Sequence, residues 1–105
     1  MPADKREAFR WFMRAAQEGL VIAQFNVGNL YLVGQGVEKD AGAGVKWLRR
    51  AAEAGSAPAQ HSLGVCFRDG RGVEADAGAA REWFARAAAN TSVGGKFVTT
   101  VLGRV

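Results

Sequence analysis

The 105-residue sequence has little of what disulfide-linked, metal-binding and membrane proteins need. It contains one cysteine, Cys66, one histidine, His61, and two prolines. A single cysteine excludes an intramolecular disulfide and a cluster of cysteine ligands around a metal. No stretch approaches the about 18 consecutive apolar residues of a membrane span, and the charged segment 1–10 lacks the apolar region of a signal peptide. We therefore expect a cytoplasmic protein without a bound metal or cofactor.

The charge is moderately basic, with a formal net charge of +4 and an isoelectric point near 9.8. The Lys and Arg residues are scattered along the chain and alternate with Asp and Glu. A nucleic-acid surface usually gathers its basic residues on one face or in one run. Nucleic acid is therefore not the expected partner, and weak binding through a basic surface is kept as an alternative.

An internal repeat is the strongest feature of the sequence. Trp11, Trp47 and Trp83 follow one another at intervals of 36 residues, and each is followed at the fourth and fifth positions by Ala-Ala. The same interval superimposes the segments 34–37 and 70–73, which share the pattern Gly-x-Gly-Val. A fixed period of this length is typical of a solenoid, in which each repeat buries its apolar face by stacking on its neighbours.

Each repeat is predicted to consist of a first helix, a glycine turn and a second helix. The apolar spacing predicts a first helix from Ala23 to Val33 and second helices over 5–18, 41–54 and 77–89. The next first helix is expected to begin after Ser56 as its N-cap, with Pro58 in its first turn. The glycines of the turn allow the chain to reverse, and Val37 and Val73 are expected to pack beneath it. The residues before the second helices are expected to be N-caps: Asp4, Asp40 and Asp76.

The core is predicted from the apolar stripes of these helices. Their members are Ala23, Val27, Leu30 and Tyr31, then Ala59, Leu63, Cys66 and Phe67, and on the middle second helix Gly44, Trp47, Leu48, Ala51 and Ala52. Trp47 is expected to fill the gap between layers, so that Trp47→Ala would cost about 3–5 kcal/mol. Gly44 lies inside a helix, where glycine lowers helix propensity, and is expected to make the start of that helix less stable. Arg14 and Arg50 are expected to pair with Glu18 and Glu53 on the solvent side.

The sequence therefore predicts one all-α domain over 1–105, with about six helices. Its parts are a leading second helix (1–19), two repeats (20–55 and 56–90) and a degenerate C-terminal capping helix (91–105). The last part lacks the Ala-Gln and Leu-Gly motifs at the positions that the 36-residue period gives them. It keeps only a helical spacing of apolar residues: Phe97, Val98, Val101, Leu102 and Val105.

These repeated residues resemble the Sel-one-like repeat, a relative of the tetratricopeptide repeat. The resemblance covers residues 4–90 and rests on Ala23-Gln24, Val27-Gly28, Tyr31, Gly34-x-Gly-Val37, Asp40, Trp47, Ala51-Ala52 and Gly55, and on their counterparts 36 residues later. Phe67 replaces the usual tyrosine of the second copy. The resemblance implies a right-handed α-α superhelix that works as an adaptor, found in bacterial and eukaryotic proteins, which holds a protein or peptide on its concave face.

By similarity to tetratricopeptide repeats, the first-helix positions outside the core face the groove of the superhelix. These positions are Ile22, Phe25, Asn29 and Leu32 in one copy and Pro58, His61, Val65 and Arg68 in the next. The candidate binding residues are six of them: Phe25, Asn29, Leu32, His61, Val65 and Arg68. Asn29 could pair with a peptide backbone, because its amide both donates and accepts, and Arg68 could hold a carboxylate. The alternative is that all six are ordinary solvated side chains.

An enzyme is the first rival to a binding protein. Some cysteine-rich relatives are linked to β-lactam binding or hydrolysis, but this chain lacks their paired cysteines and any Ser-x-x-Lys motif. His61 and Cys66 are five residues apart on one predicted helix, which places them about 140° apart around its axis. They cannot form a direct catalytic pair, so we expect no catalytic residues.

The ends of the array lead to one more expectation. The chain begins with a second helix, on which Phe9, Trp11, Phe12 and Met13 give more apolar surface than one neighbouring helix can cover. We expect either self-association through the terminal helices or a longer array in which another repeat covers this surface.

Overall fold

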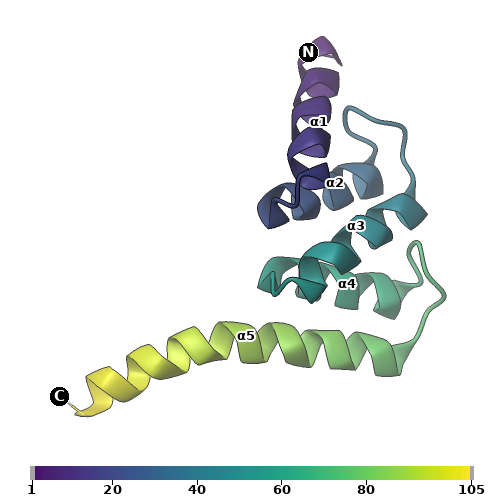
Figure 1. Cartoon of the computed structure of the whole chain (residues 1–105). Coiled ribbons are helices and arrows are strands. Elements are labelled where there is room, and N and C mark those ends of the chain that lie inside the picture. Colours follow the sequence, from purple (N-terminus) through teal and green to yellow (C-terminus); the bar gives the residue numbers. More distant parts are fainter. Residues whose placement is uncertain (1, 105) are drawn as a thin grey trace.

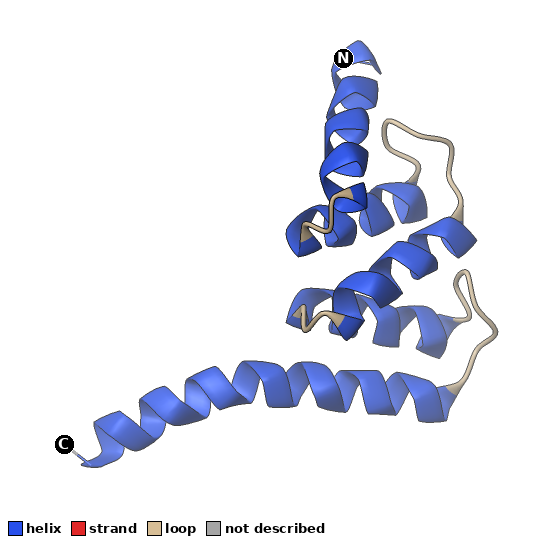
Figure 2. Ribbon diagram, viewed as in Figure 1, coloured by secondary structure: helices blue, strands red, loops and turns tan. Residues whose placement is uncertain are grey.

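The computed structural model describes the backbone of residues 2–104 and the side chains of residues 4–91. The described backbone consists of helices and turns, without a strand (Figures 1 and 2). Its five helices are α1 (Pro2–Gln17), α2 (Val21–Val33), α3 (Ala41–Glu53), α4 (Ala57–Asp69) and α5 (Ala77–Arg104). The prediction of an all-α stack of helical repeats is confirmed. Within residues 2–104, no helix is both long and apolar enough to cross a membrane.

Side-chain caps fix the starts of three helices. At α4 the cap is Ser56, whose hydroxyl oxygen accepts a hydrogen bond from the backbone N–H of Ala59 at 3.2 Å. Asp40 and Asp76 accept hydrogen bonds from the backbone N–H groups of Ala43 and Ala79, each at 3.0 Å, as the sequence predicts. Asp4 differs, because α1 already begins at Pro2 and Asp4 lies in its first turn. There the carboxylate faces the positive end of the helix dipole without being the N-cap. The Gly-x-Gly-Val turn that precedes the other two aspartates does not precede Asp4.

The glycine turns serve two purposes. Gly34 and Gly70 end α2 and α4 in the left-handed conformation, with φ of 74° and 69°. Gly72 also has a positive φ, and a Cβ on it would overlap the carbonyl oxygen of Ala41. The turn after α4 therefore lies directly on the start of α3. This second purpose, close packing on the preceding repeat, adds to the reversal predicted from the sequence.

Within one repeat the two helices pack through glycine. A Cβ added to Gly28 of α2 would come within 2.8 Å of the Leu48 side chain and 3.0 Å of the Gly44 carbonyl oxygen of α3. A Cβ on Gly64 of α4 would come within 2.7 Å of the Phe84 ring of α5. Gly44 thus permits close helix packing, a benefit that offsets its low helix propensity.

Between repeats, buried glutamines join one helix to the next. The side-chain N–H of Gln24 donates to the carbonyl oxygen of Ala16 at 3.2 Å, and that of Gln60 donates to Ala52 at 3.0 Å. Both glutamines are at most 9% exposed. Each bond joins the start of a first helix to the Ala-Ala motif of the second helix before it. This contact explains why the Ala-Gln motif and the Ala-Ala motif recur together.

The predicted apolar stripes form two packed clusters. One contains Ala23 and Val27 with Phe9 of α1, and Trp47 packs against it; the other joins α3, α4 and α5. Val37 and Val73 pack at the edges of the clusters beneath their turns, as expected. Trp47 is only half-buried.

One expectation about the ends of the helices changes. The tail does not form a separate sixth helix, because α5 continues without a break from Ala77 to Arg104. Gly19 and Gly55 follow α1 and α3 with φ of 96° and 99°, whereas Thr91 occupies the same register after Ala-Ala in α5. A threonine does not favour the left-handed turn, so the helix runs on. The apolar positions expected to cap the stack, from Phe97 to Val105, lie outside the described side chains.

Candidate binding groove

Three neighbouring hollows lie along α2, α4 and α5. The first, of about 470 Å³, lies between the start of α2 and the turn into α4. Ile22, Phe25 and Asn26 line it from α2, and Pro58 lines it from α4. The side chain of Ile22 is 72% exposed, so this hollow offers apolar surface directly to a ligand.

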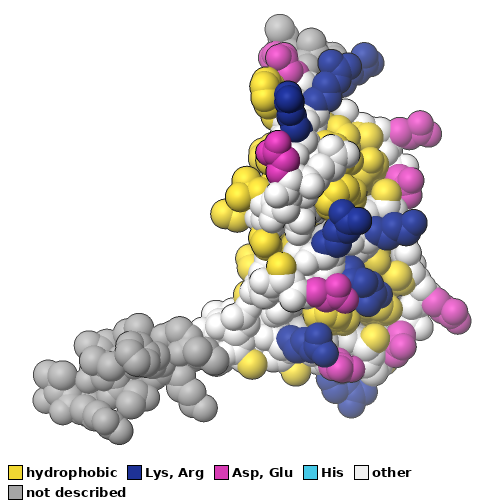
Figure 3. Space-filling view, in the orientation of Figure 1, with side chains coloured by type: hydrophobic (Ala, Val, Ile, Leu, Met, Phe, Trp, Pro, Cys, Tyr) yellow, Lys and Arg dark blue, Asp and Glu magenta, His cyan; other side chains and the backbone are white. Residues whose placement is uncertain are grey.

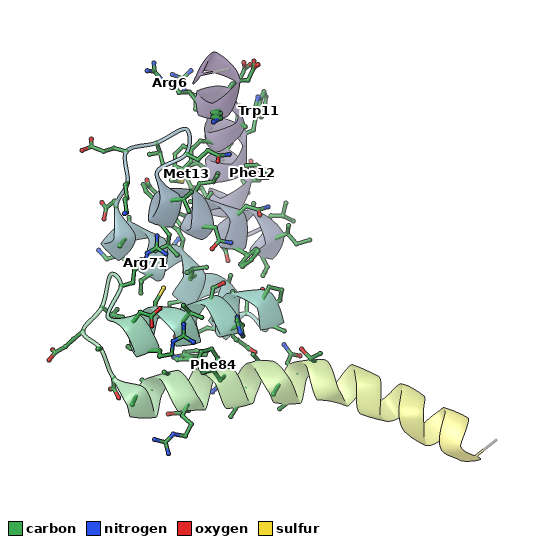
Figure 4. All side chains as sticks on the ribbon, turned by 180° about the vertical axis from the view of Figure 1, so that it is seen from behind. Arg6, Trp11, Phe12, Met13, Arg71 and Phe84 are labelled. Atoms are coloured by element: carbon green, nitrogen blue, oxygen red, sulfur yellow. The ribbon has the colours of Figure 1, made fainter. Side chains whose placement is uncertain are left out.

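The central hollow, of about 180 Å³, lies between α2 and α4 further along both helices. Its lining combines Asn29 with His61, Ser62 and Val65, and Arg71 borders it from the turn after α4. A guanidinium N–H of Arg71 donates to the carbonyl oxygen of Leu32 at 2.7 Å. Figure 4 shows Arg71 reaching from this turn towards the preceding repeat. The bond satisfies a carbonyl group at the end of α2 and holds the cation beside the hollow.

The terminal hollow, of about 580 Å³, lies between α4 and α5. Pro58 and His61 border it on one side, and Phe84, Ala88 and Thr91 border it on the other. The His61 and Phe84 rings lie 5.2 Å apart at 55°. Beside this hollow, α5 extends past the beginning of α4 (Figure 1).

Shared residues make the three hollows continuous. Pro58 lines both the first and the terminal hollow, and His61 lines both the central and the terminal hollow. We call the three together the groove. Its lining is mainly apolar, with a few amide, hydroxyl and imidazole groups, one arginine and no carboxylate. Apolar walls with a few placed polar groups are typical of ligand-binding surfaces.

Four of the six groove residues predicted from the sequence line these hollows with half-buried or exposed side chains. They are Phe25, Asn29, His61 and Val65. Leu32 is different: it is 6% exposed and belongs to the core, although it forms part of the floor of the central hollow. The physical reason is Gly44, since a Cβ there would come within 3.0 Å of the Leu32 side chain. The glycine of α3 makes room for Leu32 to turn inwards.

Arg68 is also placed differently from the expectation. It lines none of the three hollows, and its guanidinium pairs with Asp69 at 2.9 Å on the exposed surface. This hydrogen bond raises the pKa of Arg68 and lowers the pKa of Asp69. The cation at the groove is instead Arg71, which the sequence reasoning missed. The sequence did contain a signal for this role: Arg71 takes the place of Gln35 in the Gly-x-Gly-Val motif, which is otherwise the same in both copies.

Other arginines lie over tryptophans. The guanidinium of Arg50 lies 4.7 Å from the Trp47 ring, and that of Arg86 lies 4.6 Å from the Trp83 ring. Stacking on the ring thus takes the place of the expected pairing of Arg50 with Glu53. On the face shown in Figure 3, the Lys and Arg side chains are interspersed with Asp and Glu.

The cysteine and the histidine of α4 have separate surroundings. Cys66 is 1% exposed, and burial raises the pKa of its thiol, so that little reactive thiolate forms near neutral pH. His61 is exposed and stacks near Phe84. Among the described residues, no three His, Cys, Asp or Glu side chains are grouped so that they could hold a metal ion.

The Sel1 repeat family matches the chain over residues 1–20, 21–56 and 57–92. The first match covers α1, the second covers the pair α2 and α3, and the third covers α4 and the first part of α5. This chain belongs to the Sel1 repeat family. The family boundaries at 20 and 56 fall in the turns before α2 and α4. Proteins of this family generally act as scaffolds for protein–protein interaction and are typically not enzymes.

Solved Sel1 repeat structures resemble the fold closely. A Sel1 repeat protein from Oxalobacter formigenes is 36% identical in sequence and superimposes with a TM-score of 0.77. The match covers 81% of this chain and 35% of the Oxalobacter chain. The protective antigen c5321 of uropathogenic Escherichia coli, which displays the same fold, is 43% identical with a TM-score of 0.78, over 79% of this chain and 18% of its own. The chain therefore spans about a third or less of these proteins. No curated protein matches it in sequence.

Proposed function

We propose that the groove binds an extended segment of a protein or peptide partner without catalysing a reaction. The observation that supports this most is the continuity of the three hollows through Pro58 and His61. A bound segment can place apolar side chains at Ile22 and Phe25 and again at Phe84, and its backbone can pair with the Asn29 amide between them.

The charges of the groove favour a neutral or acidic segment. No carboxylate lines the hollows, and Arg71 provides a cation beside the central one. A carboxylate on the partner would gain a charge-assisted hydrogen bond there. A lysine-rich partner would find no matching acid in the groove.

Two other functions considered from the sequence have less support. Catalysis by a cysteine–histidine pair is disfavoured because the Cys66 thiol is buried and His61 faces solvent. Nucleic-acid binding is disfavoured on the face of Figure 3 by the interspersed acids. We therefore propose a role as an interaction scaffold.

The test begins with peptides selected from a random display library on the immobilised full chain. Their affinity is then measured by fluorescence polarisation for the wild type and for two variants of α2. Ile22 lines the first hollow and is 72% exposed, whereas Val33 is 60% exposed and lines none of the three hollows. Ile22→Asp should weaken binding at least about tenfold.

Val33→Asp is the matched control and should leave the affinity unchanged, with circular dichroism confirming that both variants are folded. Equal effects of the two substitutions would contradict binding in the groove. A library that yields no saturable binder would contradict it as well.

A further inference from the structure

The central hollow differs from its two neighbours because a cation lies beside it. Arg71 borders this hollow, whereas the linings of the first and terminal hollows contain no Lys or Arg. The Asn29 amide and the Ser62 hydroxyl lie in the same hollow, and both residues are partly exposed. The hollow of about 180 Å³ therefore combines several hydrogen-bond donors with one positive charge, and its lining contains no carboxylate.

The backbone of α2 holds the Arg71 side chain in place. One guanidinium N–H donates to the carbonyl oxygen of Leu32 at 2.7 Å, and among residues 4–91 this is the only hydrogen bond of that side chain. A guanidinium has five N–H donors. Because a carbonyl group is neutral, the bond positions the side chain without neutralising it. The positive charge and further donors are left for a ligand in the hollow.

The acid nearest to Arg71 along the chain is bound to a different arginine. Arg68 donates to both carboxylate oxygens of Asp69, at 2.9 and 3.3 Å. This hydrogen bonding lowers the pKa of Asp69, and the charge of Arg71 adds a smaller contribution in the same direction. The ion pairs of residues 4–91 join Arg68 to Asp69 and Arg86 to Glu82. Within this part of the chain, Arg71 therefore has no carboxylate partner.

The two neighbouring hollows would not by themselves fix the register of a bound segment. Their linings are mainly apolar, with Phe25 in one and Phe84 in the other, and apolar contacts are not directional. A carboxylate, in contrast, can pair with the single cation in one register only. One guanidinium also matches the single charge of Asp or Glu better than the nearly double charge of a phosphate.

We infer that Arg71 determines the specificity of the groove by selecting a segment with one Asp or Glu at the central hollow and apolar residues before and after it. This inference rests on the proposed function, in which the segment continues from the first hollow to the terminal one. The carboxylate therefore belongs to a side chain inside the segment and not to a chain end. The other copy of the turn has Gln35 at this position, so the repeat itself supplies a neutral replacement.

The first experiment selects peptides from one random display library on the immobilised full chain and, separately, on an Arg71→Glu variant. The carboxyl end of each peptide is fused to the carrier, so that a free chain end cannot be selected. The wild type should enrich an acidic residue between apolar residues at least about fivefold over the unselected library. Arg71→Glu should enrich Lys or Arg at that position instead.

Arg81→Glu is the matched control for this selection. Arg81 is an exposed arginine of α5 that lines none of the three hollows, and its substitution changes the net charge equally. This variant should enrich the same peptides as the wild type. Selection of basic peptides by both variants would show that overall charge is read and would overturn the role of Arg71.

The second experiment measures affinity by fluorescence polarisation for the best wild-type peptide and for a version in which the matching amide replaces its acidic residue. Arg71→Gln should weaken the acidic peptide about tenfold, the size of a charge-assisted hydrogen bond. The neutral peptide should bind the wild type and Arg71→Gln within about twofold of each other, because the charge pair is already absent. Arg81→Gln should change neither affinity, and circular dichroism checks that each variant is folded.

Three outcomes separate this inference from the proposed function. Selected peptides that need Ile22 but show no acidic enrichment would overturn the inference and leave binding in the groove in place. Equal weakening of both peptides by Arg71→Gln would show that Arg71 acts through the backbone of α2 and not through its charge. Loss of affinity when the carboxyl end of the peptide is amidated would show that a chain end occupies the hollow. A library without a saturable binder would overturn both proposals.

Discussion

The three tryptophans occupy one position of the repeat but three different environments, which makes them an internal test of the packing. Trp83 is 8% exposed in the cluster between α4 and α5, Trp47 is half-buried, and Trp11 is 63% exposed. We expect the cost of truncation to follow this order. The residue type, the helix position and the Ala-Ala word that follows are the same in each case.

The magnitudes follow from burial. Removing a buried tryptophan side chain costs about 3–5 kcal/mol, and Trp83→Ala should fall in this range. The cost of Trp47→Ala should be about half as large, roughly 1.5–2.5 kcal/mol, because much of the ring already contacts water. This value is lower than the sequence pattern alone predicts. Trp11→Ala should change the free energy of unfolding by about 0.5 kcal/mol or less, as surface substitutions usually do.

The assay is urea unfolding at 25 °C, followed by circular dichroism at 222 nm for the wild type and the three variants. The denaturant slope should stay constant, so that the midpoints report stability. A Trp11→Ala variant as destabilised as Trp83→Ala would refute the reasoning. So would a Trp83→Ala variant that unfolds with the wild type.

Three other predictions concern the buried contacts. Gly64→Ala should lower the free energy of unfolding by about 1–3 kcal/mol, measured by thermal or urea unfolding, because the added Cβ would meet the Phe84 ring. Gly78→Ala should raise it by up to about 1 kcal/mol, because a Cβ there meets only an Asp76 oxygen at 3.4 Å. Destabilisation by both substitutions would contradict this prediction. Gln60→Glu should cost about 3 kcal/mol at pH 7, where a buried carboxylate would face the Ala52 carbonyl. Burial raises the pKa of such a carboxyl in the folded state, so a pH series of unfolding curves should show stability recovering as the pH falls, with the recovery complete below the ordinary Glu pKa of about 4.3. A cost that does not depend on pH would contradict this. Cys66 should react with a thiol reagent only on unfolding, and labelling of the native chain as fast as a free thiol would contradict its burial. Since burial raises its pKa, its contribution to folding is present below the ordinary thiol pKa of about 8.5 and is lost as the pH rises through the folded-state value.

The helices and their order could be predicted from the sequence because the repeat gives three views of the same pattern. Asp40, Asp76 and the paired glycines signal their local geometry directly, and the structure bears out those predictions. The continuation of α5 could have been read from Thr91, which replaces the glycine that follows Ala-Ala in the other copies.

The groove was less predictable because helical periodicity gives the direction of a side chain but not the space in front of it. Leu32 and Arg68 hold the same position of the repeat, yet Leu32 is buried and Arg68 is exposed. The difference lies on the partner helix, where Gly44 is replaced by Ala80 in the next copy. The role of Arg71 likewise depends on a backbone oxygen 39 residues away. Such features depend on tertiary contacts that a single sequence does not display.

The most direct test of the account is a map of backbone amide shifts in the full chain when a selected peptide binds. The largest shifts are expected along α2 and α4, around Phe25, Asn29 and His61, with a further group near Phe84 of α5. The outer surface of α3, including Lys46 and Arg49, should be unaffected. Shifts concentrated on that outer surface, with none at His61, would contradict the groove as the binding site.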